Sequence, residues 1–184
     1  FRDAILQGMD FVEGLPSLLT LGVKPTRAET GYGYIQIGDE SKGAIRSVKT
    51  FTEKPNRELA QVFVDSGEFF WNTGIFIWKA GSIIEAIKQY LPEVSIRFEA
   101  CSDSFGRPGS EQVVQKQLAA CPNISIDVGI MEKATNVYVL CTDFGWSDVG
   151  TWGSLYALSQ KDTCENVVLH GRCLLYTSPS PRDS

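Results

Sequence analysis

The ten-residue run FFWNTGIFIW, at residues 69–78, constrains the fold more than any other stretch of the chain. Aromatic and β-branched side chains fill most of it, and such side chains favour a strand that is covered on both faces. The polar triplet Asn72–Gly74 interrupts the run, and we expect it to bend the strand. A strand this apolar belongs in the middle of a sheet, so the rest of the chain must supply its neighbours.

Segments with strand and helix patterns alternate along the whole chain. Continuous or alternating apolar residues predict strands, and apolar residues at helical spacing predict helices. We expect strands at 17–23, 32–37, 45–52, 69–78, 137–140 and 167–169, with 125–133 leading back to the sheet, and helices at 1–14, 59–64, 82–91, 110–120 and 151–159. Ser82 and Glu85 have the spacing of a capping box. The alternation indicates an α/β fold with a mostly parallel, mixed sheet.

The composition excludes several classes of protein. The chain has 184 residues, of which 43% are hydrophobic and 21% charged, as is ordinary for a globular domain. Its net charge of -5 and the lack of a Lys/Arg run argue against binding to nucleic acid or to an anionic membrane. It has neither an apolar run long enough to span a membrane nor a signal-peptide pattern. We therefore expect a soluble, cytoplasmic protein.

The cysteine and histidine content narrows the chemistry. The five cysteines are far apart in the sequence and form no C-x-x-C pair, so neither a zinc site nor a disulfide framework is expected. The single histidine, His170, leaves no pair of histidines for a metal and little basis for a Ser-His-Asp or Cys-His mechanism. Catalysis would have to rest on carboxylates, lysine, backbone donors and a metal ion.

The hexapeptide FTEKPN, at residues 51–56, places an acid and a base at the end of a strand. Glu53 and Lys54 follow the expected strand at 45–52, and Pro55 stops that strand because it has no N–H to donate. Ligands of open α/β sheets collect beyond the carboxyl ends of strands. Lys54 could bind a phosphate there and Glu53 could accept hydrogen bonds from sugar hydroxyls. The alternative is a solvated ion pair at a loop entrance.

Two further stretches carry groups suited to a sugar. In ETGYGY, Gly33 would let a ligand approach the backbone closely at the start of a strand, although a plain turn is the commoner use of G-x-G. In WNTG, Asn72 offers a donor and an acceptor with which to recognise hydroxyls. The alternative for Asn72 is a hydrogen bond to a local backbone turn.

The stretch DFGWSDVGTW offers a metal ligand. Its Asp148 lies between tryptophans and glycines, which suit a shaped and partly dry loop. Because Mg²⁺ prefers one or two carboxylates together with substrate phosphates, a single aspartate suffices for half of such a site. The alternative is an N-cap or Asx turn before the helix expected at 151–159.

Taken in order, PTRAETGYGYI, FTEKPN, FFWNTGIFIW, SIDVGIMEK and DFGWSDVGTW resemble the mannose-1-phosphate guanylyltransferases of the sugar-phosphate nucleotidyltransferase family. The resemblance covers residues 1–172. It implies a Rossmann-like nucleotidyltransferase domain, with GTP and mannose 1-phosphate as substrates, Mg²⁺ as cofactor, and GDP-mannose and pyrophosphate as products.

The resemblance also implies roles for individual residues. Gly33 would contact the sugar through its backbone, and Glu53 would accept hydrogen bonds from sugar hydroxyls. Lys54 would bind the sugar phosphate and take part in catalysis. Asn72 would recognise mannose hydroxyls, and Asp148 would be a catalytic carboxylate of the Mg²⁺ site.

Several points stay open beside this resemblance. The motif SIDVGIMEK is part of it, but no role for Asp127 follows. The Gly-rich nucleotide loop and the first Mg²⁺ aspartate are expected upstream of Phe1, so we expect a piece of the catalytic domain that lacks its N-terminal part and is inactive alone. Alternatives are a different hexose-1-phosphate nucleotidyltransferase and a non-catalytic sugar-phosphate-binding subunit. Homo-oligomer formation is also left open.

The last residues differ from the rest. Residues 173–183, CLLYTSPSPRD, show no helix or strand periodicity and look like the translated end of a common sequencing-library adapter. We therefore expect the domain piece to span 1–172 and assign 173–184 to this tail. The alternative is a natural Ser/Pro-rich tail.

Overall fold

The structure, a computed structural model, describes residues 1–150 and 152–168. The chain divides into two compact units, Phe1–Trp146 and Ser147–Ser184, which we describe separately. The predicted tail at 173–184 and His170 lie outside the described residues. No helix within the described ranges is both long and apolar enough to cross a membrane.

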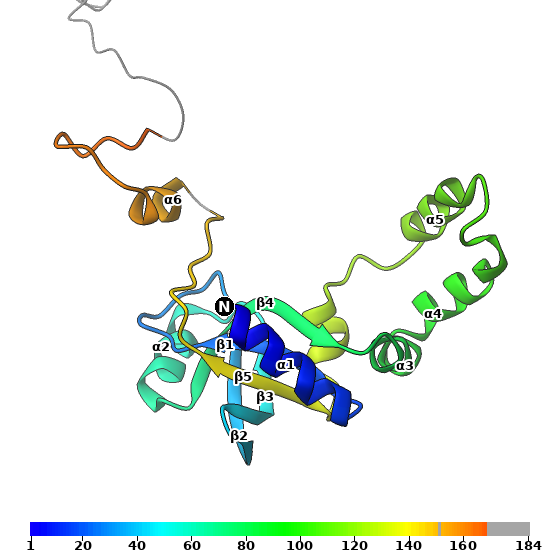
Figure 1. Ribbon diagram of the computed structural model, residues 1–184, viewed down its shortest axis with the longest axis horizontal. Coiled ribbons are helices and arrows are strands. Elements are labelled where there is room, and N and C mark those ends of the chain that lie inside the picture. Colours follow the sequence, from blue (N-terminus) through cyan, green and yellow to red (C-terminus); the bar gives the residue numbers. More distant parts are fainter. Residues whose placement is uncertain (151, 169–184) are drawn as a thin grey trace, which may run out of the picture. The chain divides into compact units, whose positions relative to one another are not determined.

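The first unit contains most of the helices and strands (Figure 1). Its elements are α1 (Arg2–Gly14), β1 (Leu18–Val23), β2 (Tyr34–Lys42), β3 (Ile45–Thr52), α2 (Arg57–Ser66), β4 (Phe69–Trp78), α3 (Ala80–Tyr90), α4 (Pro92–Glu99), η1 (Ser102–Ser104), α5 (Ser110–Ala119), η2 (Asp127–Met131) and β5 (Val137–Thr142).

The five strands in the described part of the chain form one closed, mixed sheet in the order β1-β4-β2-β3-β5. This confirms the α/β class and the mixed sheet, but the expectation of a mostly parallel sheet is wrong. Within the described residues, only β1 and β5 pair in parallel; the other four strand pairs are antiparallel. One reason is local, because only two residues separate β2 from β3 and so short a connection joins antiparallel strands. The first of the two, Gly43, has φ +63°, which favours glycine.

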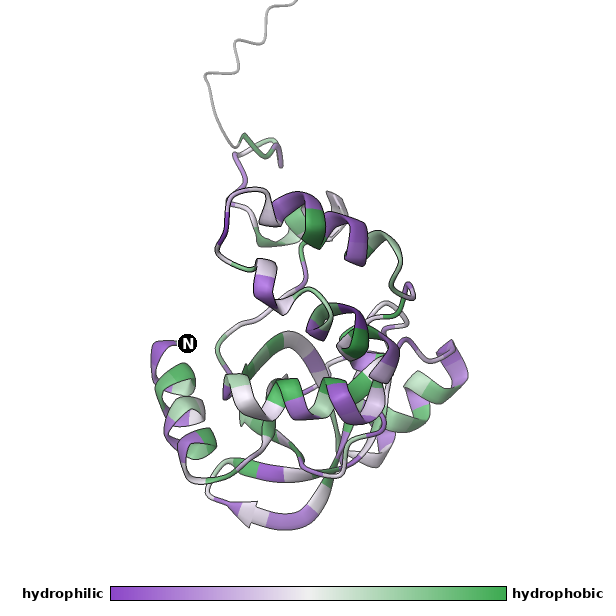
Figure 2. Cartoon of the chain, turned by 90° about the vertical axis from the view of Figure 1, so that its right-hand side faces the viewer, coloured by the Kyte–Doolittle hydropathy of each residue, from purple (hydrophilic) through white to green (hydrophobic). Residues whose placement is uncertain are grey.

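The core lies on both faces of β1, all six residues of which are buried. On one face, Phe11 and Val12 of α1 pack with Leu19 and Leu21. Figure 2 shows hydrophobic and hydrophilic residues alternating along α1, beside the N-terminal label. On the other face, a second cluster includes Leu18 and residues of η2 and α3. Burial on both faces explains why β1 reads as a continuous apolar run.

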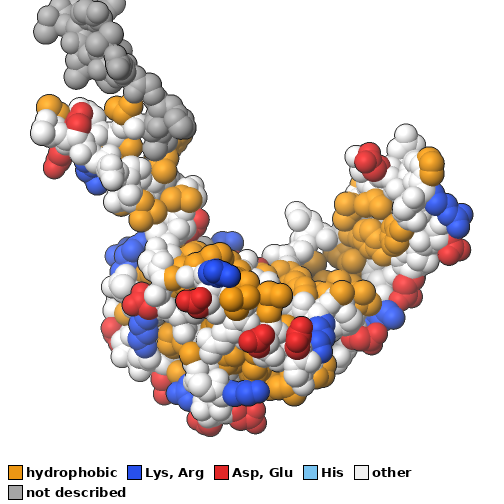
Figure 3. Space-filling model, in the orientation of Figure 1, with side chains coloured by type: hydrophobic (Ala, Val, Ile, Leu, Met, Phe, Trp, Pro, Cys, Tyr) orange, Lys and Arg blue, Asp and Glu red, His pale blue; other side chains and the backbone are white. Residues whose placement is uncertain are grey.

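Helices α3 and α4 and the turn η1 form an apolar groove of about 340 Å³ in the same unit. In Figure 3, apolar side chains gather over α4 and α5, while acidic and basic side chains are interspersed elsewhere on the face in view. Helix α4 was not predicted, because Pro92 was interpreted as the end of α3. Proline is also favoured in the first turn of a helix, and Pro92 begins α4.

The second unit contains α6 (Trp152–Leu158). The hydroxyl of Tyr156 donates to the Glu165 carbonyl at 2.8 Å, which ties the helix to the following turn. The helix expected at 151–159 is therefore present. Val167 and Val168, expected to begin a short strand, have no regular secondary structure, and Leu169 lies outside the described residues.

Candidate functional site

Three of the predicted site residues meet where β2 begins and β3 ends, next to Asn72 within β4. The first residue of β2 pairs with the last residue of β3 and with Trp71 of β4. Gly33, Glu53 and Asn72 are the next residues along the three chain segments beyond these paired residues. The backbone N–H of Asn72 donates to the Gly33 carbonyl at 2.8 Å, so the pairing continues past the end of β2.

Gly33 occupies a position with no space for a side chain. A Cβ atom at Gly33 would lie 2.6 Å from Oε2 of Glu53 and 3.3 Å from Cβ of Asn72. In the described parts of the chain, the N–H of Gly33 has no backbone hydrogen-bond partner. Glu53 and Asn72 fill the side-chain direction of Gly33, so the predicted contact between its backbone and a ligand stays a prediction. Glycine is required at position 33 because a side chain would clash with its neighbours. The backbone conformation does not require it, since the φ of Gly33 lies outside the left-handed region.

The loop between β3 and α2 presents Glu53 and Lys54. Pro55 follows them, and the side chain of Asn56 caps α2 by accepting from the Leu59 N–H at 2.9 Å. Lys54 has φ 47°, a left-handed conformation that is uncommon for a residue other than glycine. Such conformations persist only where the surrounding structure holds them, and they cluster at functional sites.

Glu53 and Lys54 form an ion pair with very different exposure. The ammonium of Lys54 lies 2.9 Å from Oε1 of Glu53; the lysine side chain is 64% exposed and the glutamate side chain 18%. The hydrogen bond and the charge of Glu53 raise the pKa of Lys54, with a smaller contribution from Asp127. Lys54 is thus a cation at neutral pH that solvent can reach, and Glu53 is too buried to be a simply solvated partner.

Asn72 is 9% exposed, and its side chain is held by three hydrogen bonds. Its Oδ1 accepts from the hydroxyl of Thr20 at 2.9 Å and from the N–H of Gly74 at 3.2 Å. Its Nδ2 donates to Oδ1 of Asp127 at 3.0 Å. The contact with Gly74 is the local backbone turn considered as an alternative, and the bond to Asp127 adds a partner 55 residues away.

Sequence reasoning missed Asp127 and Glu132 as members of this cluster. The stretch expected to return to the sheet forms instead the π-helical turn η2, which buries Ile130 and Met131 in the core. Asp127, at the start of η2, reaches Asn72. Just after η2, Oε1 of Glu132 accepts from the N–H of Glu53 at 3.2 Å. A signal was available, because the two acids flank the apolar residues that anchor the turn.

Asp127 is partly buried beside charges of both signs. Burial is the main cause that raises the pKa of Asp127, followed by repulsion from Glu53. The hydrogen bond from Asn72 and the charge of Lys54 act in the opposite direction. A carboxylate with a raised pKa is a stronger base, and hence a better hydrogen-bond acceptor, than an ordinary surface aspartate.

Asp148 lies in the second unit and is exposed. Its Oδ1 accepts from the N–H of Gly150 at 3.0 Å, which is the Asx turn considered as an alternative. This turn leaves the carboxylate with capacity for a cation. In residues 1–150 and 152–168, no three His, Cys, Asp or Glu side chains are grouped to hold a metal. Asp148 thus suits Mg²⁺ only as one ligand beside phosphates and water.

Residues 2–165 match the family model of the nucleotidyl transferases. The chain belongs to the nucleotidyl transferase family. Its relatives include the mannose-1-phosphate guanylyltransferase of Escherichia coli K12, 38% identical over 179 residues, which are 93% of this chain and 36% of that protein. The mannose-1-phosphate guanylyltransferase of Salmonella montevideo is 40% identical over 160 residues, or 82% and 33% of the two chains. This nucleotidyl transferase chain thus spans about a third of the length of these curated relatives.

Solved structures resemble this nucleotidyl transferase as well. One is a Thermus thermophilus protein described as a mannose-1-phosphate geranyltransferase, with a TM-score of 0.74 and 33% identity over 85% of this chain and 44% of that one. Another is described as mannose-6-phosphate isomerase from Helicobacter pylori, with a TM-score of 0.67 and 26% identity over 80% and 58% of the two chains. The predicted nucleotidyltransferase fold is thereby confirmed.

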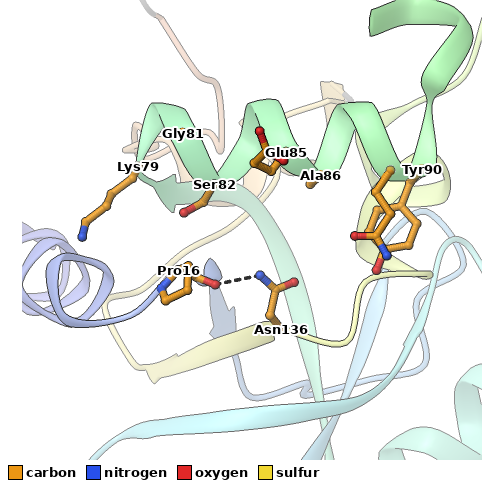
Figure 4. A pocket seen from close by; sticks show the side chains of 9 residues that line it. Pro16, Lys79, Gly81, Ser82, Glu85, Ala86, Tyr90 and Asn136 are labelled. Atoms are coloured by element: carbon orange, nitrogen blue, oxygen red, sulfur yellow. Dashed lines mark hydrogen bonds between the residues drawn. The ribbon is translucent and has the colours of Figure 1, made fainter.

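A pocket of about 390 Å³ lies elsewhere in the first unit of this nucleotidyl transferase (Figure 4). Lys79, Ser82 and Glu85 of the α3 segment line one side, and Pro16 and Asn136 lie opposite, joined by a 2.8 Å hydrogen bond from the Asn136 amide to the Pro16 carbonyl. None of the predicted site residues lines this pocket.

The candidate site on chemical grounds is therefore the group of side chains and backbone at the strand ends. It brings together a reachable cation, partly buried hydrogen-bonding groups and a glycine whose N–H has no backbone partner among the described residues. We call it the strand-end cluster, and its members are Gly33, Glu53, Lys54, Asn72 and Asp127.

Proposed function

We propose that this chain is the sugar-phosphate-binding part of a mannose-1-phosphate guanylyltransferase. The whole protein would transfer GMP from GTP to mannose 1-phosphate and release pyrophosphate, in the cytoplasm and with Mg²⁺. Family membership and the names of several curated relatives support the reaction class and the sugar. The observation that carries the proposal is the strand-end cluster, which combines an exposed ammonium with partly buried hydrogen-bonding groups.

The chemistry of the strand-end cluster suits a hexose phosphate. The solvent-accessible ammonium of Lys54 can bind a phosphate as a point charge. Carboxylates at Glu53 and Asp127 and the amide of Asn72 supply acceptors and a donor for hydroxyls. The backbone N–H of Gly33, which has no backbone partner among the described residues, could donate a further hydrogen bond.

The proposed reaction requires positioning rather than a covalent protein intermediate. An oxygen of the sugar phosphate attacks the α-phosphorus of GTP in line, a new O–P bond forms, and the bond to the β-phosphate oxygen breaks to release pyrophosphate. Lys54 would hold the attacking phosphate, while Glu53 and Asn72 would orient the sugar. Mg²⁺, when bound with help from Asp148, would supply charge neutralisation. This division of labour fits a chain whose single histidine is His170.

The function is tested on the full-length protein that contains this chain. Each of mannose 1-phosphate and glucose 1-phosphate is incubated with GTP, UTP or dTTP and Mg²⁺, and pyrophosphate release is followed. We expect mannose 1-phosphate with GTP to give the highest kcat/KM. Preference for glucose 1-phosphate would assign a different sugar, and no turnover with any pair would contradict an enzymatic function.

Gly33→Ala is expected to weaken use of the sugar phosphate. The new Cβ would lie 2.6 Å from the Glu53 carboxylate, so Glu53 and its partner Lys54 have to move. Displacement of positioning groups by about 1 Å can cost about 100-fold, so we expect kcat/KM for mannose 1-phosphate to fall at least tenfold. The matched control is Gly31→Ala, whose Cβ would lie 3.7 Å from its nearest neighbour, Oε1 of Glu29. Equal effects of the two substitutions would contradict the assignment of Gly33.

A further inference from the structure

The orientation of the Asn72 amide is determined by partners that have only one hydrogen-bonding role each. The backbone N–H of Gly74 can only donate, so the amide oxygen has to face it. The ionised carboxylate of Asp127 can only accept, so the amide nitrogen has to face that side. Rotating the amide by 180° would set donor against donor and acceptor against acceptor.

This orientation limits what Asn72 can offer to a ligand. An amide oxygen has two lone pairs, and the oxygen of Asn72 already accepts from Thr20 and Gly74. The hydroxyl of Thr20 lies nearer to Asn72, at 2.9 Å, than to the Ile75 carbonyl, at 3.3 Å. Of the two amide hydrogens, one points to Asp127. Asn72 therefore retains a single N–H for a substrate and no acceptor, contrary to the expectation that it offers both.

Asp127 is the nearest group that can replace the missing acceptor. A carboxylate can accept about four hydrogen bonds, so the bond from Asn72 leaves most of its capacity unused. The Glu53 carboxylate is less suited, since its Oε1 is paired with Lys54 and its Oε2 lies against Gly33. Burial, which raises the pKa of Asp127, also makes it the stronger base.

We propose that Asp127 and Asn72 act as one unit that recognises two neighbouring oxygens of the sugar. Asp127 accepts a hydrogen bond from a sugar hydroxyl, and the remaining N–H of Asn72 donates to the adjacent oxygen. Asp127 is then a specificity-determining residue of the sugar subsite. This inference rests on the proposed function, and it narrows the substrate class to sugars with a correctly placed hydroxyl donor.

The experiment is a thermodynamic cycle between one residue and one hydroxyl. In the full-length enzyme, kcat/KM is measured for wild type and Asp127→Asn with mannose 1-phosphate and each of its monodeoxy analogues. The amide oxygen that this substitution introduces can still accept from Asn72, so the orientation of Asn72 is preserved. We expect a loss of about 10- to 100-fold with mannose 1-phosphate, because a hydrogen bond to a charged group contributes about 1.5–3 kcal/mol.

With one of the deoxy analogues, Asp127→Asn is expected to cause no further loss of kcat/KM. The hydroxyl that this analogue lacks is the one that donates to Asp127. The matched control is Asp65→Asn on α2, where the carboxylate also accepts from a side-chain amide, that of Gln61 at 2.8 Å. Asp65→Asn should leave all rates unchanged. Asp127→Glu, which keeps the charge but moves the carboxylate, is the second variant and should show the same pattern.

Three outcomes would overturn the proposal. Unchanged kinetics in both Asp127 variants would remove Asp127 from the subsite. An equal loss with mannose 1-phosphate and every deoxy analogue would show that Asp127 only supports Asn72. In both of these cases the proposed function is unaffected, provided that the wild-type enzyme makes GDP-mannose. Wild-type enzyme that makes none overturns the proposed function and this inference together.

Discussion

Asp148→Asn in the full-length enzyme is expected to lower kcat about 100-fold or more, because a metal ion contributes several kcal/mol of charge stabilisation in the transition state. The substitution is conservative for the fold. An asparagine oxygen can still accept from the N–H of Gly150, so the Asx turn at 148–150 is retained while the negative charge is lost. The measurement is kcat at increasing Mg²⁺ concentration, and the variant should need more Mg²⁺ for its half-maximal rate.

The matched control is Asp162→Asn in the same unit. The Asp162 side chain also forms a turn, accepting from the N–H groups of Cys164 and Asn166 at 2.9 and 2.8 Å. It carries the same charge but has no proposed role at the metal, so its kcat and Mg²⁺ dependence should stay within about twofold of wild type. A similar effect at Asp162 and Asp148 would mean that the loss is structural, and no effect at Asp148 would remove it from the metal site.

Lys54→Ala is expected to raise the KM for mannose 1-phosphate about 10- to 100-fold, since a charge-assisted hydrogen bond to phosphate is lost. Alanine and lysine are similarly disfavoured at φ 47°, so the substitution tests the ammonium rather than the backbone. The KM for GTP should change much less. Steady-state kinetics with each substrate varied in turn separate the two effects.

Two controls separate the loss of the Lys54 ammonium from other effects of Lys54→Ala. Lys49→Ala removes the same charge from the exposed part of β3 and should leave both KM values unchanged. The double variant Glu53→Gln/Lys54→Ala shows how much of the loss comes from leaving Glu53 unpaired. If Lys49→Ala weakens sugar-phosphate use as much as Lys54→Ala does, the effect is one of net charge and the assignment of Lys54 fails.

The strands of the site were predictable because the pattern of apolar and β-branched residues along them indicates strands. The bounds of β3 and β4 agree with the sequence prediction, since apolar and β-branched runs end at Pro55 and near Lys79. Gly33 and Glu53 were also predicted as neighbours of a ligand at strand ends. Once β2 lies between β3 and β4, the register alone brings them beside Asn72.

Other features could not be read from local patterns. Ser82 was predicted to cap α3, but the helix begins at Ala80 and the Lys79 carbonyl accepts from the N–H of Ile83 at 3.2 Å. Ser82 therefore lies inside the first turn of α3, and the N-cap position is occupied by Lys79, which makes no side-chain cap hydrogen bond. Asp127 was missed because its stretch was expected to lead back to the sheet, whereas packing of η2 against the core holds it in a turn. Its partner is 55 residues away, and only the tertiary fold reveals that pair.

The central claim is that the strand-end cluster binds a hexose 1-phosphate. The most direct measurement is a crystal structure of the full-length protein with mannose 1-phosphate. We predict the phosphate at the ammonium of Lys54, and sugar oxygens at Asp127 and at the free N–H of Asn72. Mannose 1-phosphate bound elsewhere, with these three side chains facing solvent, would contradict the account.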